Sequence, residues 1–409
     1  MKSLNYIDLF AGAGGLSEGF LRQNFNALAH VEMNKSACET LITRVVYNYL
    51  KNENRVNVYY QYLNQEISRN DFWNSAPKKL VNSVINCEIN DFSIDSIFER
   101  IDQQLHNNKV DLIIGGPPCQ AYSIIGRARD PQSMKQDPRN FLYKSYVKFL
   151  ERYKPKMFVF ENVPGILSAN NGTHFENIKI AIKQAGYELD WKILNAKDFG
   201  VLQDRKRVII IGCLKDLKYN YPNFELKANT NKVFDDLMYD LPKLQNGEGS
   251  LGIVNYVNGI NEYLEKSSIR NCIDFTTQHV SRPNNENDLE IYKIAVSEWK
   301  LGKRLNYAHL PTKLIKHKNT TSFTNRFQVV NGNGCSHTVV AHISADGHYY
   351  IHPDINQNRS ITVREAARIQ SFPDDYFFEG GRTAAFKQIG NAVPPLMGEE
   401  IAKKIKEII

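Results

Sequence analysis

The sequence predicts an α/β protein built on an open sheet of buried strands. Short apolar segments at 6–10, 112–114 and 156–160 alternate with helix-like segments. The first apolar segment runs directly into the glycine turn 11–15, and a helix-like segment follows it. Strand, glycine turn and helix in this order begin a nucleotide-binding βαβ unit. From residue 213 the composition shifts toward Asn, Lys and Tyr with few long apolar runs, which indicates a change in organisation.

Length and composition narrow the class of protein. A chain of 409 residues can hold two domains, or one large domain with an insertion. Its six cysteines form no CxxC pair, which argues against a zinc ribbon or a disulfide framework and indicates a reducing compartment. We see no signal-peptide pattern and no apolar run approaching ~18 residues, so we expect a cytoplasmic protein without a membrane partner. The net charge of +7 is compatible with a polyanionic partner without requiring one.

The glycine turn predicts a small-molecule site. Ser17 stands where the last glycine of GxGxxG would be, and no Lys-Ser/Thr pair follows, so the turn is not a phosphate-binding P-loop. Such a turn suits an uncharged or cationic ligand, with a plain tight turn as the alternative. Glu32 ends the next predicted strand, where it is placed to accept hydrogen bonds from ribose hydroxyls, and Met33 could cover an adenine face. A surface carboxylate is the alternative for Glu32.

The stretch 111–123, DLIIGGPPCQAYS, predicts a reactive cysteine. Two glycines end the apolar run, and Pro117 and Pro118 then have a fixed φ and no N–H, so the backbone leaves the strand on a stiff, non-helical path. Cys119 follows at the carboxyl edge of the sheet, where ligands bind in open α/β sheets. A thiol on a rigid turn can face a pocket, whereas a buried structural cysteine is the alternative.

Further polar groups are expected at the same edge. The strand 156–160 leads into Glu161. In QDRKR at 203–207, alternation puts Gln203, Arg205 and Arg207 on one face if the segment is extended. The polar loop 124–139 has no apolar stripe, and loops of this length are usually functional, for example as lids.

The remaining segments give weaker indications of function. Residues 51–79 are polar and show no clear period, so we interpret them as an insertion. Basic and aromatic residues alternate between 299 and 327, which suits a nucleic-acid face, with a solvated basic surface as the alternative. Four histidines between 337 and 352 lack a carboxylate or cysteine set that completes a metal geometry, so we expect no metal. The stretch 386–395 is predicted to turn into a final helix, 396–409.

These segments, in this order, closely resemble the C5-cytosine DNA methyltransferases. The matching residues are DLFAGAGG at 8–15, Glu32, Asp91, GGPPCQAYS at 115–123, ENV at 161–163, QDRKR at 203–207, REAARIQSFP at 364–373 and QIGNAVPP at 388–395. The resemblance implies a doubly wound, mostly parallel, Rossmann-like sheet that binds S-adenosyl-L-methionine, with a smaller target-recognition domain. It places the catalytic domain at 1–212 plus 386–409 and the recognition domain at 213–385, and it implies that the C-terminal helix packs on the N-terminal domain.

The resemblance also implies a reaction. A methyl group passes from S-adenosyl-L-methionine to C5 of a flipped-out cytosine in a specific duplex DNA sequence, through a covalent bond between Cys119 and C6. Glu161 resembles the residue that contacts N3 and the exocyclic amine, and it must carry a proton to donate. Arg207 is expected to contact the base O2, with Arg205 alongside in a supporting role; either arginine could lower the pKa of Cys119.

The cofactor residues follow from the same resemblance. A sulfonium cofactor without phosphate explains the missing P-loop lysine. The implied positions are Phe10, Gly12, Gly14 and Leu16 along the cofactor, Glu32 at the ribose with Met33 beside it, Asp91 at the adenine amino group, Pro117 and Leu142 flanking the adenosine, and Asn391 near the methionine end.

Three alternative functions stay open at this point. An RNA (tRNA) cytosine-5 methyltransferase would use the same scaffold. A catalytically silent DNA-binding relative is disfavoured by the presence of Cys119, Glu161 and Arg207. A nicotinamide dehydrogenase is disfavoured by the missing third glycine and the PPCQ turn. Family habit further implies a restriction-modification system with a partner restriction endonuclease, and the chemistry requires one chain only.

Overall fold

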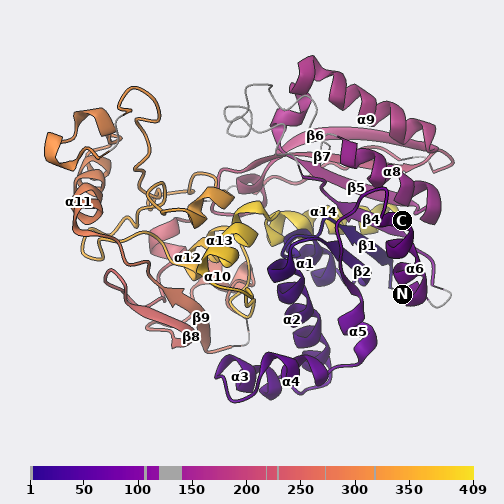
Figure 1. Ribbon diagram of the computed structural model, residues 1–409, viewed down its shortest axis with the longest axis horizontal. Helices are drawn as coiled ribbons and strands as arrows, with labels where there is room; N and C mark the ends of the chain where they lie inside the picture. The colour runs from indigo at the N-terminus through magenta and orange to yellow at the C-terminus, as the bar shows by residue number, and fades with distance from the viewer. Residues whose placement is uncertain are drawn as a thin grey trace.

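Figure 1 shows the computed structural model, in which a large α/β layer lies beside a second region with a small sheet of its own. The structure describes residues 3–105, 108–118, 141–217, 219–227, 230–271, 273–316 and 319–409. Within these ranges a seven-stranded sheet has the order β3-β2-β1-β4-β5-β7-β6, and β8 and β9 form the two-stranded sheet. The strands are β1 Asn5–Leu9, β2 Asn26–Glu32, β3 Val84–Asn86, β4 Leu112–Gly115, β5 Met157–Asn162, β6 Tyr187–Asn195, β7 Lys206–Leu214, β8 Gly249–Asn255 and β9 Phe275–Val280.

The large sheet is mostly parallel, as predicted. β1 pairs in parallel with β2 and β4, β2 with β3, and β4 with β5. β7 alone in this sheet runs antiparallel, between β5 and β6. The start of β7 therefore lies at the same edge as the carboxyl ends of β4 and β5, which brings the QDRKR segment to that edge.

Helices cover both faces of this sheet, so it is doubly wound. One apolar core joins the sheet to α6, α8 and α9, and a second joins the opposite face to α1 and α14. The helices are α1 Gly15–Arg22, α2 Lys35–Asn52, α3 Asn57–Leu63, α4 Arg69–Asn74, α5 Lys78–Asn82, α6 Ile94–Leu105, α8 Leu142–Tyr153, α9 Thr173–Gln184, α10 Glu262–Lys266, α11 Glu286–Lys300, α12 Val363–Ile369, α13 Arg382–Asn391 and α14 Pro395–Ile408. Among the helices of the described ranges, none combines the length and the apolar character needed to cross a membrane.

The last helix of the chain, α14, packs against the first helix, α1. A Cβ atom added at Gly19 would lie only 2.3 Å from the carbonyl carbon of Gly398 and from the Glu399 nitrogen. Glycine at position 19 therefore permits direct backbone contact between the two helices. Arg22 adds an ion pair to Glu399 at 3.2 Å. The expected return of the C-terminal helix to the N-terminal domain is confirmed.

The polar segment 51–79 folds into three short helices, α3, α4 and α5. Helices of seven, six and five residues are too short to display a period in the sequence, although Tyr59, Leu63 and Phe72 are buried against α2. The Tyr59 hydroxyl donates to the carbonyl of Asp375 at 2.9 Å. The segment thus links α2 to a part of the chain that lies more than 300 residues away.

One prediction about the C-terminal motif was wrong. We expected the stretch 386–395 to be a turn, but α13 begins at Arg382 and continues to Asn391. The turn is confined to 392–394, and the final helix begins at Pro395. Apolar residues of α13 pack into a core with α12, so tertiary burial stabilises a helix that the glycine and asparagine of the motif disfavour locally.

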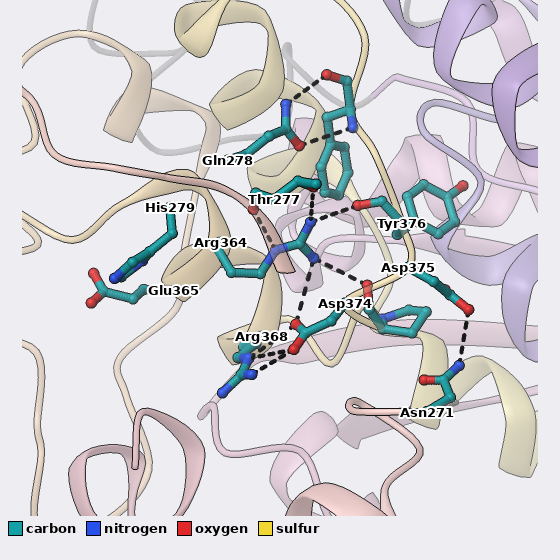
Figure 2. Close-up of polar contacts among 12 residues, drawn as sticks. Asn271, Thr277, Gln278, His279, Arg364, Glu365, Arg368, Asp374, Asp375 and Tyr376 are labelled. Carbon is teal, nitrogen blue, oxygen red and sulfur yellow. Dashed lines mark hydrogen bonds and ion pairs between the residues drawn. The ribbon is translucent and has the colours of Figure 1, made fainter. Parts of the chain in front are cut away.

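The REAARIQSFP segment forms a buried polar network (Figure 2). Arg364 donates to the carbonyls of Thr277 and Tyr376 at 3.0 and 2.8 Å, which ties β9 to the chain that follows α12. Arg368 pairs with Asp374, as Figure 2 shows, and also with Asp240, and all three side chains are fully buried. Buried charges need such partners to offset their lost hydration. This network joins the small sheet to the segment leading into α13.

Candidate active site

The GGPP turn at the end of β4 passes between two neighbouring strands with no room for side chains. A Cβ atom at Gly115, whose φ is +145°, would lie 2.0 Å from the carbonyl oxygen of Leu9 in β1. A Cβ atom at Gly116 would lie 2.6 Å from both the carbonyl oxygen and Oε2 of Glu161 in β5. Glycine is needed at both positions because the backbone approaches its neighbours so closely. The turn and Glu161 are therefore in direct contact.

Asn162 fixes the path of the backbone after these glycines. Its side chain is buried, and its amide donates to the carbonyl of Pro117 at 3.1 Å. The ENV motif contributed to the resemblance, yet nothing in the sequence revealed this contact. Cys119, the predicted nucleophile, and the predicted lid 124–139 lie outside the described residues. What the structure describes is the turn that leads to Cys119 and its support by β5.

Glu161 and Arg207 form an ion pair at this edge. Arg207 Nε lies 2.7 Å from Glu161 Oε1, and Arg207 Nη1 donates to the carbonyl of Lys206 at 2.8 Å. The two side chains are 14% and 10% exposed, so the pair is shielded but still reachable by a ligand. A charge-assisted bond of this kind orients the carboxyl group. The structure thus brings together two of the predicted site residues, one from β5 and one from β7.

The alternation predicted for QDRKR is confirmed: Gln203, Arg205 and Arg207 are buried and the residues between them are more exposed. Arg205 donates to the carbonyls of Val339 and Gly390 at 2.7 and 3.0 Å. These hydrogen bonds connect the start of β7 to the GNAVPP segment. Arg205 therefore supports the backbone around the site, and its guanidinium is engaged by carbonyl groups.

The glycine turn and Glu32 form a second cluster at the carboxyl edge. Phe10, Gly12 and Gly14 all have left-handed backbones, with φ of 56°, 54° and 76°. Glu32 accepts the N–H of Gly12 on Oε2 at 2.8 Å and that of Asn34 on Oε1 at 2.7 Å. Burial raises the pKa of Glu32, and these backbone N–H groups offset part of that shift. The turn is held to the end of β2 by an oriented carboxylate.

Two other predicted cofactor residues are exposed near this cluster. Met33, next to Glu32, is 59% exposed. Asp91 is exposed and lies 2.7 Å from the ammonium group of Lys148. The hydrogen bond from Lys148 lowers the pKa of Asp91. Both side chains are accessible to a ligand from solvent.

The rest of the predicted cofactor set is spread over several elements. Leu16 is buried among the residues that join the sheet to α14, and Phe10 packs on the core of the opposite face. Pro117 is buried in the GGPP turn, Leu142 is the first residue of α8, and Asn391 is exposed at the end of α13. The segments that carry Phe10, Leu16, Pro117 and Leu142 follow or adjoin the carboxyl edge of the sheet. The end of α13 is joined to this edge by the hydrogen bond from Arg205 to the carbonyl of Gly390.

Comparison with known proteins identifies the family. The family model for C-5 cytosine-specific DNA methylases matches residues 4–59 and 65–407. The chain belongs to this family. Among similar curated proteins, the Type II methyltransferase M.Bpa9945I of Bacillus paralicheniformis is 45% identical, and the match covers 98% of both chains. The Type II methyltransferase M1.HphI of Haemophilus parahaemolyticus is 31% identical over 98% of this chain and 87% of its own length.

Solved structures support the fold of this C-5 cytosine methylase. A prophage-encoded candidate DNA modification methyltransferase from E. coli aligns with a TM-score of 0.64 and 23% identity, over 99% of each chain. At this level of identity the match concerns the fold alone. It agrees with the Rossmann-like, doubly wound sheet predicted from the sequence.

Of the four histidines between 337 and 352, His352 is buried and His337 is half-buried, whereas His342 is exposed. His337 Nε2 lies 2.7 Å from the carbonyl oxygen of Tyr349, and His352 lies 3.6 Å from Glu365. Burial lowers the pKa of His337 to about 4 and that of His352 to about 3. In the described part of the chain no group of three or more His, Cys, Asp or Glu side chains could hold a metal ion.

Proposed function

We propose that this C-5 cytosine methylase transfers a methyl group from S-adenosyl-L-methionine to one cytosine of a specific duplex DNA sequence, with Cys119 as its nucleophile. The observation that carries the proposal is the contact between the GGPP turn and the Glu161–Arg207 pair. This contact presents an oriented carboxyl group beside the backbone that leads to Cys119. The match with Type II methyltransferases supports a modification enzyme paired with a restriction endonuclease.

The glycine turn and Glu32 fit the methyl donor. A carboxylate held on both oxygens by backbone N–H groups keeps lone pairs for the two ribose hydroxyls. At Gly12, whose φ is +54°, the space that a Cβ atom would occupy is open, so a ligand can approach the turn closely there; at Gly14 that space is taken by Leu41 and Tyr376. When bound, S-adenosyl-L-methionine supplies an electrophilic methyl group on a sulfonium cation. We assign Met33 and Asp91 to the adenine side of this site, and Asn391 to its methionine end.

Cys119, Glu161 and Arg207 each have a separate role in activating cytosine. The Cys119 thiolate adds to C6 of the ring, which raises the electron density at C5. Glu161 contacts N3 and the exocyclic amine of the base, and in its protonated form it donates to N3 and so stabilises the ring as C6 is attacked. Arg207 holds Glu161 through Nε and leaves Nη2 to donate to the base O2. After methyl transfer a water molecule takes the C5 proton, and the electron pair of that C–H bond expels the Cys119 thiolate from C6.

A cytosine within a duplex cannot reach this site unless it leaves the stack, which costs a few kcal/mol. We assign the loop 124–139 to closing over the flipped base. We assign residues 213–385 to recognition of the DNA, with 1–212 and 386–409 binding the cofactor and carrying out the chemistry. The buried Arg364 and Arg368 network supports this division, since it anchors β9 to the chain that enters α13.

The proposal is tested by expressing the protein in a host without cytosine methylation and mapping 5-methylcytosine in its DNA at base resolution. We expect methylation at one short motif with the wild type, and none with Cys119→Ala. Cys213→Ala is the matched control, because Cys213 is buried at the opposite edge of the sheet, and it should methylate normally. Unmethylated DNA with the wild type, together with methylated host tRNA, would refute the proposal in favour of an RNA substrate.

A further inference from the structure

The glycine turn is held by local hydrogen bonds and by one long-range hydrogen bond. The N–H of Ala11 donates to the carbonyl of Val31 at 3.1 Å, and that of Gly12 donates to Glu32 at 2.8 Å. The N–H of Gly14 donates back across the turn to the carbonyl of Ala11 at 2.9 Å. These bonds join residues that are close in the sequence. The remaining bond comes from the other end of the chain.

Tyr376 supplies this long-range bond. Its hydroxyl donates to the carbonyl of Ala13 at 2.5 Å, and both residues are buried. The peptide group between Ala13 and Gly14 is therefore bound at both ends, on its oxygen by Tyr376 and on its nitrogen by the Ala11 carbonyl. A Cβ atom at Gly14 would lie 3.1 Å from the Tyr376 hydroxyl, so this side chain also packs against the turn. Burial raises the pKa of Tyr376, and the hydroxyl keeps its proton as a donor.

The ring of Tyr376 is itself fixed by close neighbours. Its centroid lies 4.9 Å from that of Phe372 and 5.3 Å from that of Phe378. The Arg44 guanidinium lies 4.8 Å from the centre of the ring, and Arg44 is paired with Glu18 of α1 at 2.6 Å. A hydroxyl on a ring that is packed in this way has a defined position.

The backbone of Tyr376 is joined to the small sheet (Figure 2). Arg364 donates from Nη2 to the carbonyl of Tyr376 at 2.8 Å and from Nε to the carbonyl of Thr277 in β9 at 3.0 Å. The carboxylate of Asp375, the preceding residue, accepts a hydrogen bond from Asn271 at 3.1 Å. This segment therefore connects the region that we assign to DNA recognition directly with the glycine turn.

We propose that Tyr376 is a positioning residue for S-adenosyl-L-methionine. The inference rests on the proposed function, and it gives a residue of the segment 213–385 a role at the cofactor site. Without the hydroxyl, the peptide group between residues 13 and 14 can rotate while the site is empty. The cofactor then binds only the fraction of molecules with the competent turn, and the apparent affinity falls by that fraction. Because Tyr376 lies behind the turn, methyl transfer should proceed at the normal rate once the cofactor is bound.

The test is the affinity of the full-length Tyr376→Phe variant for S-adenosyl-L-methionine, measured by calorimetry. Phenylalanine keeps the packed ring and removes only the hydroxyl. We expect an affinity about 3- to 10-fold weaker than that of the wild type, which is the range that one net hydrogen bond supplies. The KM for the cofactor should rise by the same factor, with kcat at saturating cofactor and the KM for duplex DNA unchanged. Without cofactor, the amides of residues 10–17 should exchange with deuterium faster than in the wild type.

Tyr187→Phe is the matched control. Tyr187 is also fully buried, and its hydroxyl donates to the carbonyl of Pro155 at 2.9 Å, so this variant loses the same kind of hydrogen bond away from the turn. It should lose a similar amount of thermal stability and keep the cofactor affinity of the wild type. Equal affinities in the wild type and both variants would overturn the inference while leaving the proposed function standing. A wild type that binds no S-adenosyl-L-methionine would overturn both.

Discussion

Replacing His30 with glutamine should make the protein less sensitive to mild acid. His30 lies in β2 directly beneath the glycine turn, and it is 2% exposed. Its Nε2 is 2.9 Å from the hydroxyl of Ser17, which also bonds the hydroxyl of Tyr6. Its Nδ1 is buried without a partner among the described residues. The site therefore holds the neutral imidazole, and burial lowers the pKa of His30 to about 4.

The size of the effect follows from this pKa. The folded-state value of about 4 lies below the ordinary value of 6.5, so the stability that His30 contributes is present above pH 6.5 and is lost as the pH falls toward 4. Each tenfold change in proton affinity corresponds to about 1.36 kcal/mol, so the shift of the pKa from 6.5 to about 4 changes the free energy of unfolding by on the order of 3 kcal/mol. Roughly 2 kcal/mol of this is lost between pH 7 and pH 5.

The assay is urea unfolding at pH 7 and at pH 5. His30→Gln keeps a polar group near Ser17 but cannot gain the proton, so between these two pH values it should lose about 2 kcal/mol less stability than the wild type. His342→Gln is the control, because His342 is exposed, and it should behave like the wild type. Other histidines whose pKa is lowered by burial, including His337 and His352, are common to all three proteins and cancel. Equal losses in wild type and His30→Gln would refute the reasoning.

Three further predictions concern packing, cofactor and chemistry. Gly19→Ala should destabilise the protein by about 1–3 kcal/mol, because the new Cβ atom would meet the α14 backbone at 2.3 Å. Thermal unfolding measures this, and an unchanged midpoint would show that α1 and α14 can move apart without cost. Glu32→Gln should weaken S-adenosyl-L-methionine binding about 10- to 100-fold in calorimetry, as expected for a lost charged hydrogen bond, and unaltered affinity would remove Glu32 from the site. Arg207→Lys should lower kcat at least tenfold with cofactor affinity unchanged, because lysine lacks the Nε that holds Glu161; full activity would mean that charge alone suffices.

Much of the scaffold was predictable from the sequence because the signals are local. The apolar segments of β1, β4 and β5 have the length and composition of buried strands, and they were placed to within a few residues. The GGPP turn was predictable as rigid because the φ of proline is fixed by its own ring. The helices of 51–79 and the start of α13 were not predicted, since short helices show little period and depend on burial against distant residues.

In the candidate site, too, the residues were predictable from local motifs, whereas their contacts with distant residues were not. Glu161, Arg207, Gly12 and Glu32 were singled out from motifs, and the structure brings them to one edge of the sheet. No sequence signal indicated that Asn162 holds the carbonyl of Pro117. Such a hydrogen bond depends on the spacing of two strands.

By itself, the sequence determined the family, the order of the motifs and the positions where only glycine or proline suits the backbone. Tertiary structure alone decided which distant groups meet. Arg205 reaches carbonyls at 339 and 390, Tyr59 reaches Asp375, and Arg282 reaches the carbonyls of residues 343–345. Backbone preferences act within a few residues and can be read along the chain. Contacts between residues that are far apart in the sequence depend on how the strands and helices pack, and this packing exists only in the folded chain.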